Sequence, residues 1–315
     1  MSTIVEYIGE PGQRIQNIRD TYGGFKDAIK ENWFSYALFL PTLLLLLLVV
    51  WLPMLQGVWM SFHSWPISGN IEWVGLGNYQ YLFTWSAFWT SLKATLIYSM
   101  VTFMMLGIAL VAALLVANLD SFENLLSMLF MVPYTMPPVV TGTVWMFLLH
   151  PNLGPIFNYL VDLGILQQPI YWSTKGPTAL AGIMGAITWT FWPFIFLILL
   201  ATLESIPEEH YESARMYGAN RFQQFWHVTL PQLKSAILVA ISIRMVWNLT
   251  KVSQPLQLTG GGPGYKTSLL SILLYRQASE SGQLGRGFAI GMVLLAITLA
   301  FVVVFIREFE KSRGV

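Results

Sequence analysis

The sequence predicts an all-α, polytopic membrane protein with six transmembrane helices and a cytoplasmic helix–turn–helix loop. Hydrophobic residues make up 55% of the chain and charged residues only 10%, whereas charged residues are about a quarter of a soluble domain. Six apolar stretches also reach the length of about 20 residues that a membrane-spanning helix needs. Because the bilayer offers backbone groups no water, and no alternating strand pattern suggests a barrel, these stretches are expected to be helices.

The expected spans are residues 36–62, 94–117, 125–149, 178–203, 235–258 and 288–306. The third contains Pro133, Pro137 and Pro138, which remove amide donors and should kink or locally unwind it. We expect neighbouring helices to absorb this kink, in preference to a direct role for it in ligand binding. Residues 1–34 are expected to form a cytoplasmic tail with a short amphipathic segment, residues 35–310 the six-helix membrane domain, and residues 311–315 a cytoplasmic C-terminus.

Basic residues at both ends of the chain set the expected orientation, because Lys and Arg favour the cytoplasmic side. They are Arg14, Arg19, Lys26 and Lys30 before the first span, and Arg307, Lys311 and Arg313 after the last. Both termini should therefore be cytoplasmic, together with the loops near 118–124 and 204–234. The remaining loops, near 63–93, 150–177 and 259–287, should lie outside.

Several function classes are disfavoured by composition. The net charge is +1, so nothing suggests a nucleic-acid partner, and the absence of cysteine excludes disulfides and thiolate metal sites. The four histidines are scattered, which argues against a metal site. We expect no catalytic residues.

The polar loop at 204–231 reads ESIPEEHYESARMYGANRFQQFWHVTLP. Pro207 suits the first position of a helix, and the two glutamates that follow it complement the helix dipole. Gly218 can take the positive φ that ends this helix, and Asn220 is a good cap for a second helix running to about Val228. The loop is thus predicted to be a helix–turn–helix at the membrane surface, which suits contact with a partner protein.

A polar stripe marks the fifth span. Its residues Arg244, Trp247, Asn248 and Lys251 share one helix face at i, i+3, i+4 and i+7. If the helix enters the membrane near residue 235, Arg244 lies roughly 14 Å deep in a core of about 30 Å. A charge at that depth usually faces a water-filled pathway or a partner.

No Asp or Glu lies well inside any expected span. The partner of Arg244 is then a backbone carbonyl, water, another subunit or a substrate oxygen. Two interpretations of Lys251 stay open, since it either lines the same face or extends to the headgroups. A Trp beside an amide and cations suits sugars, which present an apolar ring face for stacking and hydroxyls for hydrogen bonds.

The 204–231 loop resembles the EAA loop of ATP-binding-cassette importer permeases. That pattern is Glu-Ala-Ala, three residues, Gly, nine residues, an aliphatic residue, any residue, and Leu-Pro. This chain has Glu212, Ser213, Ala214, Gly218, Val228, Leu230 and Pro231 at those spacings, with Ser213 as the one departure. Resemblance to the sugar branch of the family covers about residues 35–310 and includes WVGLGNYQYLF at 73–83, AITWTFWPF at 186–194, LESIP at 203–207 and LTGGGPG at 258–264.

The resemblance also implies site residues. Coupling to the ATPase subunit is carried over to Glu212, Ala214, Arg215, Gly218 and Ala219. Substrate binding is carried over by position to Thr190, Phe191 and Phe194 on the fourth span, and to Arg244, Trp247, Asn248 and Lys251 on the fifth. At Arg244 and Lys251 the match is positional and not chemical, because relatives often have small or amide residues there.

The implied function is that of a membrane subunit of a prokaryotic ATP-binding-cassette importer for a mono-, di- or oligosaccharide or a related polyol. Transport across the cytoplasmic membrane is by alternating access. The chain is expected to bind no cofactor and to be no enzyme, since ATP and Mg²⁺ belong to separate subunits. Its implied partners are a second permease, similar or identical, two cytoplasmic ATPase subunits and an extracytoplasmic substrate-binding protein.

Three alternatives remain. A glycerol-phosphate permease of the same family would also suit the two cations of the stripe. A secondary transporter would need an ion-coupling carboxylate or inverted repeats, and the sequence displays neither. A polytopic membrane enzyme would need clustered His, Asp or Glu at a membrane face, whereas the acidic residues here gather in the 204–231 loop without metal spacing.

Overall fold

The computed structural model describes residues 30, 32–119 and 122–312, and most of them are helical. The expected tail at 1–34 lies almost entirely outside these residues, as do residues 313–315. Within the described part, five helices are long and apolar enough to cross a membrane, and a sixth span is a helix pair bent by 91°. The predicted all-α fold class with six spans is therefore confirmed.

The first span runs from Trp33 to Ser61. The chain divides into two structural units after Trp59, so most of this span belongs to the first unit. The span consists of α2 (Trp33–Leu46), a π-helical turn (Leu47–Trp51) and α3 (Leu52–Ser61). The π turn precedes Pro53, which has no N–H for the helical ladder. No side chain of α2 is buried within this chain, as suits a helix that is apolar on every side.

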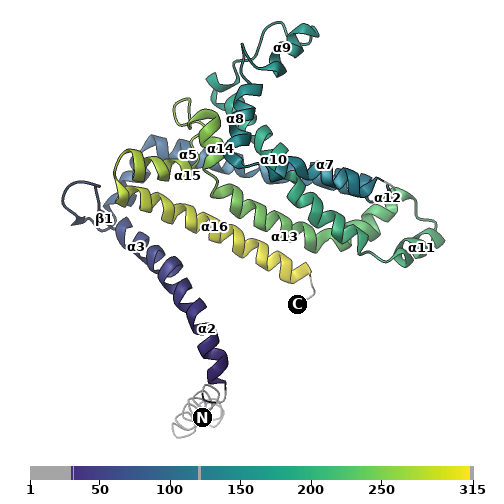
Figure 1. Cartoon of the computed structure of the whole chain (residues 1–315), viewed down its shortest axis with the longest axis horizontal. Coiled ribbons are helices and arrows are strands. Elements are labelled where there is room, and N and C mark those ends of the chain that lie inside the picture. The colour runs from purple at the N-terminus through teal and green to yellow at the C-terminus, as the bar shows by residue number, and fades with distance from the viewer. Residues whose placement is uncertain (1–29, 31, 120–121, 313–315) are drawn as a thin grey trace, which may run out of the picture. The chain divides into compact units, whose positions relative to one another are not determined.

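The second unit begins with a small hairpin, in which β1 (His63–Ser64) pairs antiparallel with β2 (Glu72–Trp73). Its remaining elements, labelled where possible in Figure 1, are α4 (Gly77–Thr84), α5 (Ser86–Ser99), α6 (Val101–Val116), α7 (Glu123–Thr135), α8 (Pro138–Leu148), α9 (Pro155–Asp162), η2 (Trp172–Thr174), α10 (Gly176–Glu204), α11 (Glu208–Met216), α12 (Arg221–Gln224), η3 (Phe225–Thr229), α13 (Leu230–Leu249), α14 (Ser253–Thr259), α15 (Leu270–Tyr275), η4 (Arg276–Glu280) and α16 (Leu284–Ser312).

The centre of this unit is the packing of α6 on α10. Ala109 and Ala113, one turn apart on α6, are fully buried, and small residues at this spacing let two helix backbones approach closely in a membrane. Ile183, Ile187 and Leu199 of α10 belong to the same buried cluster. Helix α13 packs against both α10 and α16 (Figure 1), so it forms the link between the core and the last span.

The second span begins earlier than the expected residue 94. Helix α5 starts at Ser86 and is followed by α6, so the span covers Ser86–Val116. Phe88 and Ser91, outside the expected range, are fully buried. Packing inside the protein, which a search for long apolar stretches does not detect, extends this helix.

The third span bends as its prolines predict. Met136 is extended, with ψ 136°, between α7 and α8, because the residue before a proline is driven out of the helical region. Pro137 and Pro138 then start α8, where a missing N–H is tolerated. Tyr134, at the end of α7, stacks near Phe194 of α10 with ring centroids 6.2 Å apart. The bend is therefore held by contact with a neighbouring helix.

The fifth span corrects two expectations at its start. The second loop helix does not end near Val228, and the span does not start at 235, because helical structure continues from Arg221 to Leu249. The π turn η3 lies immediately before Leu230 and Pro231. Since Pro231 cannot donate a backbone hydrogen bond, the wider turn carries the helix past it.

The fifth span also ends earlier than the expected residue 258. Helix α13 stops at Leu249, and α14 is a separate short helix. Pro255 has no N–H to give to the carbonyl of Lys251, four residues before it. That carbonyl instead accepts a hydrogen bond of 2.6 Å from Ser271 Oγ. The break therefore places Lys251 just beyond the C-terminal end of α13.

Candidate functional site

An aromatic and cationic cluster forms where α10 meets α13. The Arg244 guanidinium carbon lies 4.5 Å from the ring centroid of Phe191 and 5.5 Å from that of Trp247. Lys251 Nζ lies 4.1 Å from the same Phe191 centroid, and the rings of Phe194 and Trp247 are 5.0 Å apart. Five of the seven predicted substrate residues thus form this aromatic and cationic cluster.

The side-chain amide of Asn248 holds Arg244 in place. Its Nη2 donates to Asn248 Oδ1 at 2.8 Å, and Asn248 Nδ2 donates to Thr102 Oγ1 of α6 at 2.9 Å. Arg244 is only 2% exposed and Asn248 is fully buried. Asn248 therefore faces α6 and positions Arg244. The position of Asn248 on the polar stripe had predicted that it would line the substrate pathway. This neutral side-chain partner was not among those expected for Arg244.

Thr190 lies on another side of α10. It is fully buried, and its hydroxyl donates to the carbonyl of Ala186 at 2.9 Å. Gln254 Nε2 donates to Thr190 Oγ1 at 3.3 Å and also to Thr141 Oγ1 of α8. Thr190 therefore belongs to a polar junction of α8, α10 and α14, and the structure does not bring it into the aromatic cluster.

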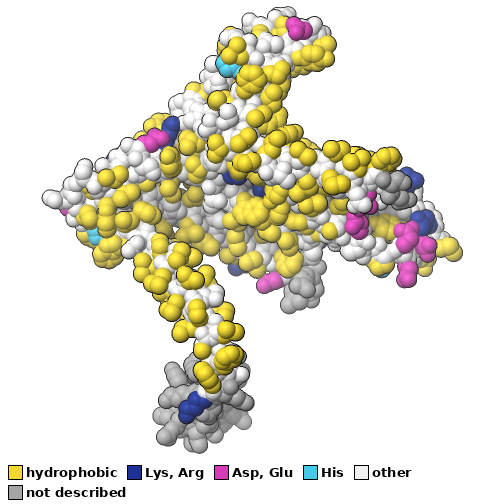
Figure 2. Space-filling model, viewed as in Figure 1, with side chains coloured by type: hydrophobic (Ala, Val, Ile, Leu, Met, Phe, Trp, Pro, Cys, Tyr) yellow, Lys and Arg dark blue, Asp and Glu magenta, His cyan; other side chains and the backbone are white. Residues whose placement is uncertain are grey.

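The accessible side of the cluster is mostly aromatic. Trp247 is 44% exposed, while Phe194 and Lys251 are half-buried. Figure 2 shows basic surface surrounded by hydrophobic surface in the region between α10 and α13. Tyr134 joins this group through its contacts with Phe191 and Phe194. Sequence reasoning missed Tyr134, for which the only signal was an aromatic residue just before the proline break.

The loop between the fourth and fifth spans forms the predicted helix–turn–helix. Helix α11 begins after Pro207, one residue later than expected, and ends in a Schellman motif around Gly218 with φ +80°. In this motif Gly218 N–H bonds to Arg215 O at 2.9 Å, and Ala219 N–H bonds to Ala214 O at 3.0 Å. Asn220 caps α12 in a reciprocal capping box with Gln223, each bond 2.9 Å long.

The surface of this loop combines charge with exposed apolar side chains. Glu212 is exposed, and Arg215 forms an exposed ion pair with Glu208 at 2.7 Å. Tyr217 is 90% exposed beside the turn, and Met216 and Phe222 are also largely exposed. Large exposed apolar groups rimmed by charge mark protein interaction sites.

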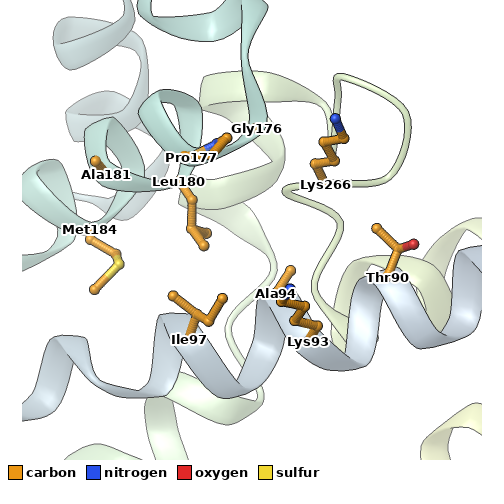
Figure 3. Close-up of a pocket in the computed structure, with 10 residues that line it drawn as sticks. All are labelled: Thr90, Lys93, Ala94, Ile97, Gly176, Pro177, Leu180, Ala181, Met184 and Lys266. Atoms are coloured by element: carbon orange, nitrogen blue, oxygen red, sulfur yellow. The ribbon is translucent and has the colours of Figure 1, made fainter.

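A separate cavity of about 640 Å³ lies between α5, the N-terminal part of α10 and the loop that carries Lys266 (Figure 3). Its lining is largely apolar and includes Ile97, Leu180 and Met184. None of its lining residues belongs to the aromatic cluster, so this cavity is not part of the predicted substrate site. Among the residues that the structure describes, no group of three or more His, Asp or Glu could hold a metal ion.

Six spans, a proline-broken third span and an exposed helix–turn–helix of the EAA type define a permease subunit of an ATP-binding-cassette importer. Residues 106–310 match the family described as the binding-protein-dependent transport system inner membrane component. The chain belongs to this family of multi-pass inner membrane proteins. The resemblance inferred from the EAA loop is thereby confirmed.

Named relatives are similar over most of their length. The chain is 30% identical to the sulfoquinovosyl glycerol transport system permease protein of Agrobacterium fabrum, over 88% of this chain and 90% of that protein. It is also 30% identical to the trehalose/maltose transport system permease protein of Thermococcus litoralis, over 90% and 96% respectively. A chain in the crystal structure of a bacterial ABC transporter that imports the acidic polysaccharide alginate matches with a TM-score of 0.79, at 23% identity, over 91% of this chain and 98% of that chain. At that identity the likeness supports the fold alone.

The positioning role of Asn248 is tested by contrast with its neighbour. Asn248→Ala leaves the buried Arg244 guanidinium without its acceptor, and such a loss costs about 1–3 kcal/mol or more for a charged group. The melting temperature of the purified protein should fall clearly. Trp247→Ala, on the same helix but at a residue that is 44% exposed and is not the hydrogen-bond acceptor of Arg244, should lower it much less. Equal melting temperatures for the two variants would contradict a positioning role for Asn248.

Proposed function

We propose that this chain is one of two membrane subunits that together form the translocation pathway of an ATP-driven importer for a sugar or related polyol. The observation that carries the proposal is the 44% exposed side chain of Trp247, whose ring lies 5.0 Å from that of Phe194 at an angle of 50°, in the same cluster as the partly exposed Lys251. Sugars bind such surfaces through their apolar ring faces and through hydroxyl hydrogen bonds. The names of two relatives, which refer to sulfoquinovosyl glycerol and to trehalose and maltose, support a sugar substrate.

In this proposal the substrate residues have two roles. Trp247, Phe194 and Lys251 contact the substrate from the open side of the cluster. Phe191, Arg244 and Asn248 form the layer behind them, and Thr190 fixes the junction of α10 with α8 and α14. Residues 35–310 form the permease domain, which encloses one half of the pathway, so a second permease, similar or identical, supplies the other half.

The 204–231 loop is proposed to bind an ATPase subunit through two kinds of its own side chains, one charged and one apolar. Glu212 offers a carboxylate to a basic partner, while Met216, Tyr217 and Phe222 offer apolar surface. Each permease of the pair would contact one of two cytoplasmic ATPase subunits. Closure of those subunits around ATP would pull on α11 and α12, and a rigid-body rotation would switch access to the substrate site.

ATP and Mg²⁺ are bound and used by those partners, and this chain itself is proposed to have no enzymatic activity. A substrate-binding protein on the outer side would deliver the sugar to the outer loops. Both termini and the 204–231 loop would face the cytoplasm, as the basic residues flanking the first and last spans favour.

Transport should depend on the exposed aromatic pair. Trp247→Ala and Phe194→Ala each remove stacking surface for a sugar, so we expect uptake of the cognate sugar by the complete importer to fall at least tenfold. Expression and recovery of the assembled complex should stay at wild-type levels. Phe103→Ala, which removes an exposed aromatic ring of α6 outside the cluster, should leave uptake unchanged. Wild-type uptake in both cluster variants would refute the proposed substrate surface.

Coupling of this chain to the ATPase subunit should depend on the turn at Gly218. A second glycine with positive φ, Gly164, serves as the control for backbone strain. Gly218 and Gly164 both have positive φ, +80° and +71°, and both have open space around the position of a Cβ. Leucine at either position carries a similar conformational penalty of about 1–2 kcal/mol. Of the two leucine variants, only Gly218→Leu should lose the ATPase subunit on purification or lose substrate-stimulated ATP hydrolysis. Glu212→Ala should show the same loss. An equal loss in Gly164→Leu would mean that backbone strain, and not a lost contact with the ATPase subunit, causes the defect.

Orientation is open to a labelling test, because the chain contains no cysteine. Ser213→Cys on α11 should react with a membrane-impermeant maleimide only after the cells are permeabilised. Ser173→Cys, in the loop before α10, should react in intact cells. Labelling of the cysteine at position 213 from outside would overturn the proposed topology.

A further inference from the structure

Two cations converge on one ring within the cluster. Arg244 and Lys251 both lie over Phe191, with the guanidinium carbon and the ammonium nitrogen 4.5 and 4.1 Å from its centroid. The Lys251 side chain therefore folds back over an aromatic side chain of α10. Two like charges over one ring disfavour each other, and opposite charge supplied nearby would lower this cost.

The surrounding helices supply no such charge. In the part of the chain that the structure describes, the ion pairs are Arg215–Glu208, Arg276–Glu280 and Lys311–Glu308. Helices α5, α6, α8, α13, α14 and α15 contain no Asp or Glu. The acidic residues of the other neighbouring helices lie at helix ends: Glu123 is the first residue of α7, Glu204 the last of α10, and Glu308 and Glu310 stand near the end of α16. Glu204 is ten residues beyond Phe194, or about 15 Å along the helix.

The groups that do contact the two cations are neutral. Arg244 has the amide oxygen of Asn248 as acceptor and the faces of Phe191 and Trp247, while its buried Nε has no hydrogen-bond partner within the described residues. The ring face of Phe191 is the partner for Lys251 Nζ. Ring faces and an amide stabilise a cation less than an anion does, so the site keeps an uncompensated positive charge.

This charge is adjacent to the stacking surface. Trp247 is 44% exposed and Lys251 is half-buried, so each is partly accessible, whereas Arg244 is only 2% exposed. Trp247 and Lys251 are linked through Arg244, which contacts Trp247, and through Phe191, which contacts both cations. One ligand of sugar size is therefore proposed to contact both. Arg244 lies behind, and its charge adds to the positive potential without direct contact. A neutral sugar would leave both cations uncompensated.

We propose that the transported solute is an anionic sugar, whose carboxylate, sulfonate or phosphate group binds Lys251 while its sugar ring stacks on Trp247. This inference rests on the proposed function, since it specifies the substrate class of the same site. Lys251 is then a specificity-determining residue, and Arg244 adds positive potential from the layer behind it.

The test measures uptake by the complete importer, with its binding protein and ATPase subunits unchanged in every arm. The probes are matched sugars that share one ring and differ at C6: glucose with glucuronate and glucose 6-phosphate, and galactose with galacturonate. The wild type should transport at least one anionic sugar with a kcat/KM at least tenfold above that of its neutral counterpart. Lys251→Gln should reduce that ratio at least tenfold, Lys251→Arg should retain most of it, and Lys93→Gln, a charge removed from the separate α5 cavity, should not change it.

The outcomes separate the two proposals. Preferential uptake of neutral sugars, as expected if a carboxylate of the second permease pairs with the two cations, would overturn the anionic substrate and leave sugar import standing. An anion preference that persists in Lys251→Gln would overturn the assignment to this site. Failure to transport any sugar, neutral or anionic, would overturn the proposed function itself and the inference with it.

Discussion

The burial of Arg244 without a carboxylate is the constraint on which the rest of this structure depends. An ionised group in the membrane interior is costly unless polar groups surround it. Here the chain places Asn248 one turn away on the same helix and uses Thr102 of α6 to orient that amide. The packing of α13 against α6 and α10 is thus tied to the position of one guanidinium, which in turn fixes where Trp247 presents its open face.

Prolines set the positions of the functional groups along the membrane helices. Pro137 and Pro138 bend the third span just after Tyr134, whose ring contacts Phe191 and Phe194 of α10. Pro231 is preceded by a π turn, which joins the helix–turn–helix loop to α13 without a break in the helix. One continuous helical segment therefore connects α12 to Arg244. This continuity offers a physical route between the proposed ATPase contact and the proposed substrate site.

Most of the fold could be predicted from the sequence, because composition, proline position and helix capping act locally. Gly218 and Asn220 took the conformations that their residue types favour. Predictions failed where contacts distant in sequence decide the outcome. The expected span end at 258 also overlooked Pro255, which is a local signal. The hydroxyl of Ser271, which bonds to the Lys251 carbonyl in place of the amide that Pro255 lacks, is a contact that the sequence does not reveal.

The candidate site follows the same division. Helical periodicity placed Arg244 and Trp247 on one face, and the structure brings them together. It also placed Lys251 on that face, but α13 ends at Leu249 and Lys251 reaches the ring of Phe191 from beyond the helix end. Periodicity did not predict that Trp247 is exposed while Asn248 is buried. Asn248 is buried against α6, where it bonds to Thr102, and this contact joins residues far apart in the sequence. Thr190 was carried over by position, yet its hydroxyl is engaged by Gln254.

The most direct measurement of the central claim is a structure of the assembled importer trapped with substrate between its two permease subunits. The account predicts a sugar ring against Trp247 and an anionic group of the same ligand within ion-pair distance of Lys251, with Arg244 still bound to Asn248. A carboxylate of the second permease in contact with Lys251 or Arg244, and substrate bound elsewhere, would contradict it.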